Sequence, residues 1–423
     1  MSMREDAGQR AALWAASADL PVHEPLEHDA RTDVCIIGAG ITGLTTAYLL
    51  AGAGRHVLVL ESAAIGAGAT GRTTAHTSNA LDDGYVALEE LHGPDGARLA
   101  AASHTAAIDT IEAIVHDEAI DCDFSRVDGF LFLAPGVSRS TLERELAAAS
   151  RAGITGVRFV ERAPLPGIDT GPCLRFPRQA QFHPLRYLAG LARAATARGA
   201  RIHERSHVTA IAGGEPFRIS TRGGPIVRAS TLVAATGSPI GDPLVTPAKQ
   251  EPFRTCVVAL RIPRGAVEPA LFWDTAAPYH YARTHPLDDA ADALLVGGED
   301  HRMGQAEDGA ERFDRLIEWA RAHFPAAGDV LFRWSGQVLE PVDRLALIGR
   351  NPAGPGGSFI ATGDSGHGIT HGTVAGILIT DLILGRGNPW AKLYRPGRAV
   401  RAPALEDPGP AGGPAVARDT ARP

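Results

Sequence analysis

The sequence predicts an α/β fold, in which a Rossmann-like dinucleotide-binding domain is built from separated segments and an antiparallel-sheet (α+β) domain is inserted between them. Three observations lead to this prediction. A strand, a glycine-rich turn, a helix and a second strand follow one another over residues 33–61. Residues 255–299 alternate between apolar and polar side chains, as an antiparallel sheet does. The stretch GDSGHGITHG, residues 363–372, places another glycine-rich turn before a helix near the other end of the chain.

The first unit follows a polar leader, residues 1–32, which is expected to lie over the surface. Residues 33–37 form the first strand, and its apolar run VCII is typical of a strand covered on both faces. Residues 42–53 form a helix and residues 56–60 a second strand. A βαβ unit therefore opens the fold.

Helices and short strands fill the rest of the chain. Helical periodicity covers residues 94–120, 140–153, 183–200 and 307–323. Strand patterns include ARIHER, VTAIA, FRIST and TLVAATG, and then TCVVALRI, ALFWD, YHYAR and ALLVGGE in the alternating middle. The dinucleotide-binding domain is assigned to residues 33–90, 180–245 and 340–395, the inserted domain to residues 91–179 and 246–339, and a disordered tail rich in Ala, Pro and Gly to residues 396–423.

The composition is that of an ordinary globular protein. The 423 residues are 44% hydrophobic and 21% charged, with a net charge of -7, and the length indicates two or three domains. This balance gives no basic field for nucleic acid or anionic lipid. The chain begins without an apolar signal-peptide stretch, and Thr380 and Asp381 interrupt its most apolar late segment. A cytoplasmic protein without a membrane span is expected.

Metal and nucleophile chemistry find no support in the sequence. None of the four cysteines, Cys35, Cys122, Cys173 and Cys256, has a second Cys or a His at metal-ligand spacing. No metal site is expected, and the thiols are expected to be buried in a reducing compartment. A serine elbow and a reactive-cysteine motif are also missing from the sequence.

The turn after the first strand has the pattern of a dinucleotide site. Gly38 permits a tight turn, Gly40 lets backbone approach a pyrophosphate, and Gly43 lets the helix pack on the strand. The second strand ends in Glu61, 18 positions after Gly43, where an acid can accept hydrogen bonds from ribose hydroxyls and repel a 2′-phosphate. The cofactor residues expected here are Gly38, Ala39, Gly40, Thr42, Gly43, Glu61 and Ser62.

Further motifs resemble flavoproteins of the D-amino-acid oxidase type, a family that includes glycine and sarcosine oxidases. GAGATGRTTAH, TLVAATGS and the final glycine stretch fall in the order of that family. PYHYAR, VGGEDHRMGQ and WSGQVLEPVDRLALIGR extend the resemblance over residues 33–395. It is closest to bacterial members whose oxidoreductase part precedes a Rieske iron–sulfur domain. The resemblance implies FAD, bound non-covalently, with His76 as the residue that would attach the flavin otherwise.

The resemblance also implies site residues. The second flavin-contacting loop corresponds to Gly71, Arg72, Thr73 and Thr74. Val208 corresponds to the residue beside the adenine, and Thr236 and Gly237 to the turn beneath the dinucleotide. In the final stretch, Gly363, Gly366 and Gly368 would run beside the isoalloxazine ring, and the helix beginning at Ile369 and Thr370 would point its positive end at the ring.

The activity implied is oxidation of a small amine or amino acid by hydride transfer from the carbon bearing the nitrogen, after which water hydrolyses the imine. Tyr279 and Arg283 lie on one face of the strand PYHYAR, and they either meet the substrate or form a solvated face. His301 and His367 are the other catalytic candidates, each with a structural alternative. His371 is expected to pack or cap.

The chain departs from its closest type in one respect. No cysteine follows Cys256, so the ligand pairs of a Rieske domain are missing from this sequence. Electrons are then expected to pass to oxygen or to a separate carrier. The alternatives left open are a flavin dehydrogenase or monooxygenase acting on another bond, and an electron-relay subunit that works with a separate iron–sulfur protein.

Overall fold

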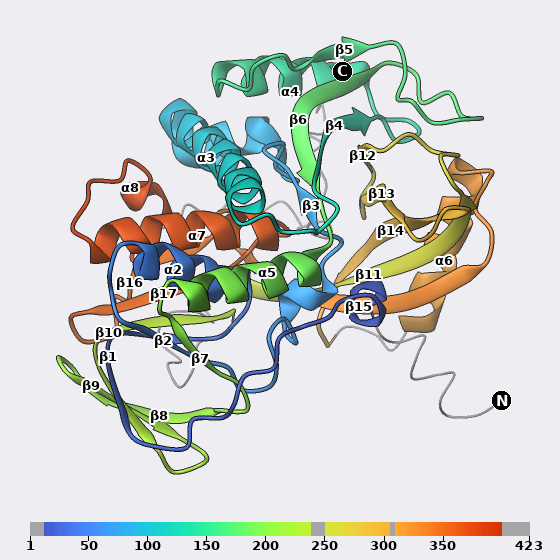
Figure 1. The fold of residues 1–423 in the computed structure, drawn as a ribbon. Coiled ribbons are helices and arrows are strands. Elements are labelled where there is room, and N and C mark those ends of the chain that lie inside the picture. The colour runs from blue at the N-terminus through green and yellow to red at the C-terminus, as the bar shows by residue number, and fades with distance from the viewer. Residues whose placement is uncertain (1–11, 238–249, 305–308, 400–423) are drawn as a thin grey trace.

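The computed structural model describes residues 12–237, 250–304 and 309–399. These residues fold around two sheets that lie side by side, each with its own helices (Figure 1). The mixed α/β fold predicted from the sequence is confirmed. The predicted leader and tail lie partly outside the described residues, at 1–11 and 400–423.

The first sheet has a parallel core. Its strand order is β16-β17-β10-β1-β2-β7, with β16 antiparallel to β17 and the hairpin β8–β9 continuing from β10. The strands are β1 (Ala30–Ile37), β2 (Val57–Leu60), β7 (Arg201–His203), β8 (Val208–Gly213), β9 (Phe217–Thr221), β10 (Ile226–Gly237), β16 (Leu347–Arg350) and β17 (Ser358–Thr362).

Strand β1 is covered on both faces, as its apolar run predicted. Val34 and Ile36 belong to the core beneath the helices, whereas Cys35 and Ile37 belong to a smaller core that includes residues of β8 and β9. Successive side chains of a strand point to opposite faces, so one apolar run serves two cores. Strand β1 pairs in parallel with β10, so the carboxyl ends of these two strands lie side by side.

Three helices cover one face of the first sheet: α2 (Ile41–Gly52), α5 (Pro184–Ala197) and α7 (Gly368–Ile383). Helices α2 and α7 pack closely because α7 presents glycine to α2. A Cβ on Gly372 would lie 2.5 Å from Ile41 Cγ2, and one on Gly376 would lie 2.5 Å from Thr45 Cγ2. This close packing brings the first turns of α2 and α7 together.

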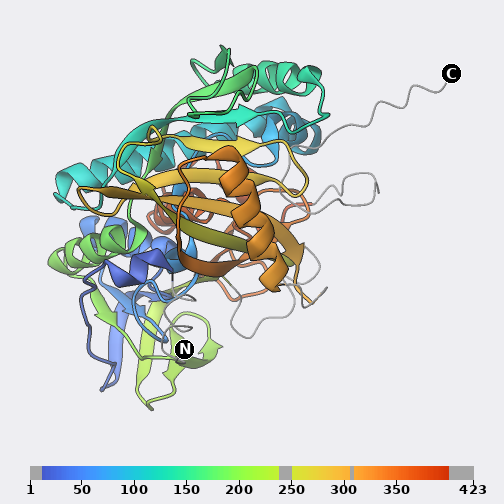
Figure 2. The same cartoon turned by 90° about the vertical axis from the view of Figure 1, so that its right-hand side faces the viewer.

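The second sheet is mainly antiparallel, with strand order β15-β11-β14-β13-β12-β4-β6-β3 and β5 paired with β6. Its strands are β3 (His76–Thr77), β4 (Ser125–Phe132), β5 (Arg158–Val160), β6 (Cys173–Gln181), β11 (Gln250–Pro263), β12 (Leu271–Asp274), β13 (His280–Pro286), β14 (Ala291–Arg302) and β15 (Val330–Pro341). Helix α6 (Gly309–His323) packs across β11 and β14 on the outer face, as Figure 2 shows.

The remaining helices surround the sheets. Helix α3 (Gly84–Asp117) is kinked at Gly93, whose φ of 72° is not helical, immediately before Pro94. The sequence placed the start of this helix at residue 94, which is the position of the kink. The others are α4 (Arg139–Arg151), α8 (Ala391–Tyr394) and the short 3₁₀ helices η1 (Leu13–Ala16) and η2 (Ala69–Arg72).

Segments far apart in the chain build each sheet. The first sheet uses residues 30–60, 201–237 and 347–362, and the second uses residues 76–77, 125–181 and 250–341. Thus β3, from a segment expected in the first domain, pairs with β6 of the second sheet. The exact domain limits stay a prediction.

Both predicted terminal segments contribute buried side chains. Trp14 of the predicted leader is fully buried. Arg398 of the predicted tail is only 7% exposed, and its guanidinium donates to both carboxylate oxygens of Asp343 at 2.6 Å. Ordered structure therefore continues past residue 396.

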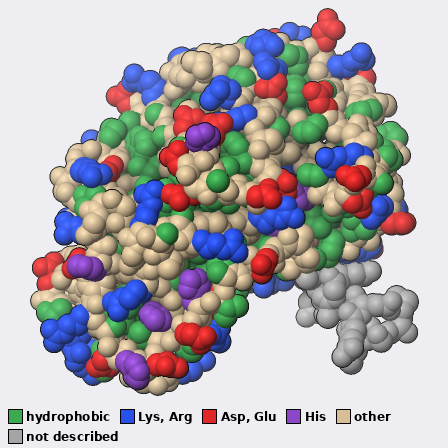
Figure 3. Space-filling view, in the orientation of Figure 1, with side chains coloured by type: hydrophobic (Ala, Val, Ile, Leu, Met, Phe, Trp, Pro, Cys, Tyr) green, Lys and Arg blue, Asp and Glu red, His purple; other side chains and the backbone are tan. Residues whose placement is uncertain are grey.

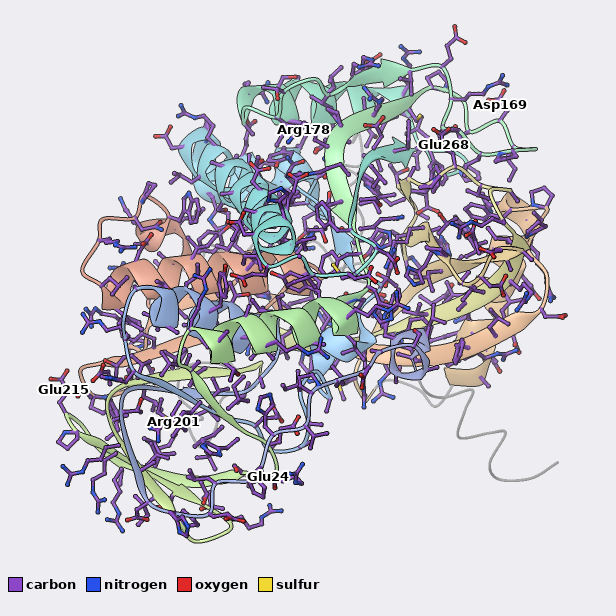
Figure 4. The ribbon with its side chains drawn as sticks, in the orientation of Figure 1. Glu24, Asp169, Arg178, Arg201, Glu215 and Glu268 are labelled. Carbon is purple, nitrogen blue, oxygen red and sulfur yellow. The ribbon has the colours of Figure 1, made fainter. Side chains whose placement is uncertain are left out.

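The outer surface carries mixed charge. Acidic and basic side chains are interspersed over the face shown in Figure 3. The side chains labelled in Figure 4 are all exposed and lie at the periphery of the fold: Glu24, Asp169, Arg178, Arg201, Glu215 and Glu268. Among the described helices, none combines the length and apolar character needed to cross a membrane.

Candidate functional site

A cavity of about 810 Å³ lies where the two sheets meet. One half is lined by the carboxyl ends of β1, β2 and β10, by η2 and by the first turns of α2 and α7. The other half is lined by strands of the second sheet. The size is at the upper end of the roughly 300–1,000 Å³ typical of ligand pockets.

Two glycines in and after the turn between β1 and α2, Gly38 and Gly43, have no room for a side chain. Gly38 has φ +105°, and a Cβ there would lie 2.5 Å from the carbonyl oxygen of Ala235. A Cβ on Gly43 would lie 1.9 Å from the carbonyl oxygen of Gly38. Gly40 is the N-cap of α2 and lines the cavity, so backbone faces whatever is bound there.

Glu61 is fixed at the edge of the cavity by hydrogen bonds. The Ala39 N–H donates to its Oε2 at 2.8 Å. The Ser62 hydroxyl and the Ala63 N–H donate to its Oε1 at 3.0 and 2.9 Å. Oε2 accepts only one of these hydrogen bonds and keeps capacity to accept another, as recognition of a ribose hydroxyl requires.

The loop around η2 forms another wall and is held by two tryptophans. The Trp14 indole N–H donates to the Thr73 carbonyl at 2.6 Å, and the Trp334 indole N–H donates to the Arg72 carbonyl at 2.8 Å. A Cβ on Gly71 would lie 2.2 Å from a backbone oxygen of the same loop. Residues of the leader and the second sheet thus hold this loop against the cavity.

The turn before α7 also brings backbone to the cavity. Gly363 and Gly366 have φ of +71° and +74°, and a Cβ on Gly366 would lie 2.5 Å from Asp82 Oδ2. Gly368 begins α7 and lines the cavity. Since α2 and α7 both begin here, two positive helix ends favour an anionic group in this half.

Most of the predicted cofactor residues line this cavity: Gly38, Gly40, Thr42, Glu61, Ser62, Arg72, Thr73, Thr74, Val208, Thr236, Gly237, Gly363, Gly366, Gly368 and Ile369. Ala39, Gly43, Gly71 and Thr370 are outside the lining. Glycine turns without room for a Cβ, two helix N-termini and the fixed Glu61 carboxylate fit a dinucleotide such as FAD.

The second half of the cavity has an aromatic wall, in which two glycines make room for large rings. A Cβ on Gly129 would lie 2.7 Å from the Trp273 ring. One on Gly297 would lie 2.2 Å from Tyr281 Cζ. The rings of Tyr279 and Tyr281 are 5.5 Å apart between centroids, and both line the cavity.

Two of the predicted catalytic residues, Arg283 and His301, do not line the cavity. Arg283 is fully buried behind the η2 loop, where its Nε donates to the Thr74 carbonyl at 2.5 Å and its Nη2 to the Phe182 carbonyl at 2.9 Å. It shares a strand face with Tyr281 but fixes backbone instead of facing the cavity. His301 is also outside the lining, and its Nδ1 pairs with the Glu299 carbonyl at 3.1 Å.

Asp300 lines the cavity and was missed by the sequence reasoning. The pairing of β11 with β14 shifts between Arg254 and Cys256. Two residues of β14, Glu299 and Asp300, therefore oppose Thr255. The Glu299 carboxylate accepts a hydrogen bond from α6 on the outer face, whereas Asp300 lines the cavity. This bulge changes the alternation of the strand and turns an acid inward.

Burial raises the pKa of Asp300 to about 7. The hydrogen bond from Thr255 lowers this pKa, the negative charges of Asp82 and Glu299 raise it, and the positive charge of Arg312 lowers it. One of its oxygens, Oδ1, has no hydrogen-bond partner within the described residues. Asp300 is only 7% exposed, so its negative charge is costly in the folded protein.

Asp300→Asn is therefore expected to stabilise the fold at alkaline pH. The unfolded carboxyl ionises near 3.8 and the folded one near 7, so the native chain loses stability as pH rises between these values. The upper limit is about 4 kcal/mol, and we expect roughly half because a buried amide also needs partners. Urea unfolding at pH 8 and pH 4 measures the gain, which should be absent at pH 4. A gain of equal size at both pH values would contradict this origin.

His367 is the N-cap of α7 and lines the cavity beside Asp82. Its Nε2 lies 3.3 Å from Asp82 Oδ1, and in the neutral ring it accepts from the Asp82 backbone N–H at 2.9 Å. Burial lowers the pKa of His367, but the Asp82 charge and hydrogen bond outweigh burial and raise it above its ordinary value. Tyr279 donates to Asp82 Oδ2 at 3.1 Å, so Asp82 is held from two sides.

His371 lies one turn further into α7. Its Nδ1 pairs with the Asp364 carbonyl at 2.8 Å, and its ring packs edge-on against His104. Burial and then the charge of His367 lower the pKa of His371 to about 3. These contacts fit the packing role expected for it.

Comparisons with known proteins agree with this geometry. The family model described as "FAD dependent oxidoreductase" (DAO) matches residues 33–382. The chain is 28% identical to a Bacillus subtilis protein described as a Rieske 2Fe-2S iron–sulfur protein, YhfW, over 93% of this chain and 76% of that protein. It is also 28% identical to gamma-glutamylputrescine oxidoreductase of Escherichia coli, over 93% of this chain and 95% of that protein.

Solved structures share the fold. Glycine oxidase from Geobacillus kaustophilus superposes with a TM-score of 0.73 at 20% identity, covering 88% of this chain and 100% of that chain. L-proline dehydrogenase from P. horikoshii superposes with a TM-score of 0.72 at 19% identity, covering 87% of this chain and 97% of that chain.

Proposed function

This chain belongs to the DAO family of FAD-dependent oxidoreductases, and we propose that it oxidises a C–N bond of a small amine or amino acid. One observation supports the proposal above others. A single cavity joins the glycine-lined dinucleotide half to the aromatic half on the second sheet. A small substrate in the aromatic half would lie against the end of the dinucleotide.

We propose that Gly38, Gly40 and the first turn of α2 hold the FAD pyrophosphate, with Glu61 on the ribose. The turn at Gly363 and Gly366 and the start of α7 would hold the ring. When bound, FAD accepts a hydride from the carbon that bears the amine, and the imine is then hydrolysed by water. The aromatic half orients the substrate and excludes water.

Non-covalent binding of FAD is supported by the surroundings of His76. Its Nδ1 pairs with the Thr74 hydroxyl at 3.0 Å, and its Nε2 lies 3.4 Å from the Ala282 carbonyl. Both ring nitrogens therefore have partners in the protein. On precipitation with acid, the flavin is expected to remain in the supernatant, as absorbance will show. Flavin in the washed pellet would contradict this expectation.

Anaerobic titration of the purified, FAD-loaded protein with a panel of amines and amino acids tests the function. Bleaching of the flavin absorbance in proportion to added substrate is the expected result. Protein that takes up no FAD, or flavin that stays oxidised throughout the panel, would refute the proposal.

We propose oxygen or a separate carrier as the electron acceptor, and the cytoplasm as the location of the protein. Reoxidation by oxygen and by a one-electron carrier distinguishes the acceptors.

Gly297→Ala is expected to lower kcat/KM for the best substrate by about tenfold, roughly 1.4 kcal/mol, with FAD content unchanged. The added methyl group would lie 2.2 Å from Tyr281 Cζ, so the ring must leave its place in the aromatic wall. Steady-state kinetics measure the effect. The control is Gly223→Ala, where the nearest atom is Pro225 Cδ at 3.7 Å. Equal kinetics in both variants would show that the Tyr281 position is unimportant.

A further inference from the structure

Apart from His367, which pairs with Asp82, the charged side chains that face the aromatic half of the described cavity are acidic. Two carboxylates line it, Asp82 from the loop before α3 and Asp300 from β14. Among the described lining residues, Arg72 is the sole Arg or Lys side chain, and it belongs to the η2 loop of the dinucleotide half. A carboxylate on the substrate would therefore be repelled by Asp300, and the His367 imidazole that lines the cavity is already paired with Asp82.

The two acids have different surroundings. Asp82 faces His367, whose raised pKa reflects a mutual attraction, and it accepts from the Tyr279 hydroxyl. Asp300 has the Thr255 hydroxyl as a partner, but its Oδ1 has none within the described residues. The negative charge of this buried carboxylate is therefore poorly compensated by the protein. A cationic ligand in the adjacent cavity would offset it.

The neighbouring rings suit a cation as well. Tyr279 and Tyr281 are inclined at 30° with centroids 5.5 Å apart, and Trp273 lines the same half. Negative ring faces attract ammonium groups within about 6 Å, most strongly where water is excluded. The Tyr281 hydroxyl lies 3.4 Å from the Thr255 hydroxyl, which ties this ring to the Asp300 side of the cavity.

Resting on the amine oxidation proposed above, we propose that the substrate is a cationic amine without a carboxylate, whose ammonium group binds between Asp300 and the rings of Tyr279 and Tyr281. The glycines of β14 make this site possible. Gly297 leaves space for the Tyr281 ring, and the bulge that follows it turns Asp300 inward. Amino acids, which carry an anionic carboxylate, are then poor substrates.

The test uses two probes of similar shape and opposite charge, tetramethylammonium and trimethylacetate. Each is titrated into the oxidised FAD-loaded protein, and the change in the flavin absorbance gives Kd without turnover. Tetramethylammonium is expected to bind at least about tenfold more tightly than trimethylacetate. Equal or reversed affinities in the native chain would overturn the proposal, as would no binding of the cation at all.

The variant Asp300→Asn identifies the residue responsible. It should weaken tetramethylammonium binding by at least about tenfold and leave trimethylacetate binding no weaker. Asp292→Asn is the matched control, since Asp292 lies on the same strand and is equally buried at 7% but pairs with Arg264 outside the cavity. Unchanged cation binding in Asp300→Asn would refute the assignment. If this variant fails to hold FAD, the relative affinities of tetramethylammonium and trimethylacetate for the native chain still test whether the site prefers a cation.

A substrate comparison separates this inference from the proposed function. Pentylamine and norleucine differ by the carboxylate on the reacting carbon, and anaerobic flavin reduction compares them. Faster reduction by pentylamine supports the inference. Faster reduction by norleucine overturns it while leaving the oxidation of C–N bonds intact. Reduction by no compound of the wider panel refutes the function itself, whatever the probes bind.

Discussion

Gly43→Ala is expected to yield folded protein with at least about a hundredfold weaker affinity for FAD, a loss of roughly 3 kcal/mol. The new Cβ would lie 1.9 Å from the Gly38 carbonyl oxygen, so α2 and the β1–α2 turn must move apart. The helix N-terminus would then leave the position where the phosphates are expected. Flavin absorbance relative to protein absorbance after purification, followed by FAD titration of the stripped protein, measures the loss.

The control is Gly309→Ala, in the first turn of α6. No atom of the described residues would lie within 4 Å of its Cβ. Alanine favours helix over glycine by about 1 kcal/mol in a helix interior, so propensity does not oppose the Gly43 substitution and the clash accounts for its cost. Full FAD occupancy in Gly43→Ala would show that the turn does not hold the cofactor.

Arg398→Ala is expected to lower the free energy of unfolding by about 3–5 kcal/mol, because it leaves Asp343 as a buried unpaired charge. The Arg398 side chain also donates to the Ala346 carbonyl at 2.8 Å and to the Leu345 carbonyl. These residues lead into β16, and Ala346 lines the cavity. Urea unfolding followed by circular dichroism measures the change, and loss of FAD affinity should accompany it.

Arg386→Ala provides the comparison for that experiment. The Arg386 side chain is 62% exposed and its Nη1 lies 3.8 Å from Asp381 Oδ1. Exposed ion pairs of this kind contribute about 0–1 kcal/mol. If both variants unfold at the same urea concentration, the buried pair does not anchor this end of the described chain.

The parts of the fold that local chemistry determines were predictable. The βαβ unit and its glycine turn agree with the structure to within three residues, because strand burial, turn geometry and helix start all depend on neighbours in sequence. The start of α3 was not predictable. Its first turns precede Gly93 and Pro94, residues that usually separate a helix from what comes before.

The aromatic half of the cavity could not be predicted because it depends on contacts across the chain. His301 was predicted to be catalytic and its neighbour Asp300 was not. Adjacent residues of a strand point to opposite faces, so only one of the two can line the cavity. The bulge opposite Thr255 decides which of the two side chains points to the cavity. A bulge cannot be read from the alternation of apolar and polar residues in the sequence. Arg283 was placed on the correct strand face, but whether it reaches the cavity depends on Thr74 and Phe182, far away in sequence.

The packing of α2 against α7 also has a consequence for biosynthesis. The two helix ends that meet at the cavity begin at Ile41 and Gly368, so a ribosome must add more than 300 residues after the first before the second exists. At about 5–20 residues per second, this takes from roughly a quarter of a minute to one minute. Until then only one of the two helix N-termini that line the cavity exists, and the glycines of α7 that pack against α2, Gly372 and Gly376, are missing. Since we propose that both helix ends hold FAD, we expect its binding to be one of the last events in the maturation of this protein.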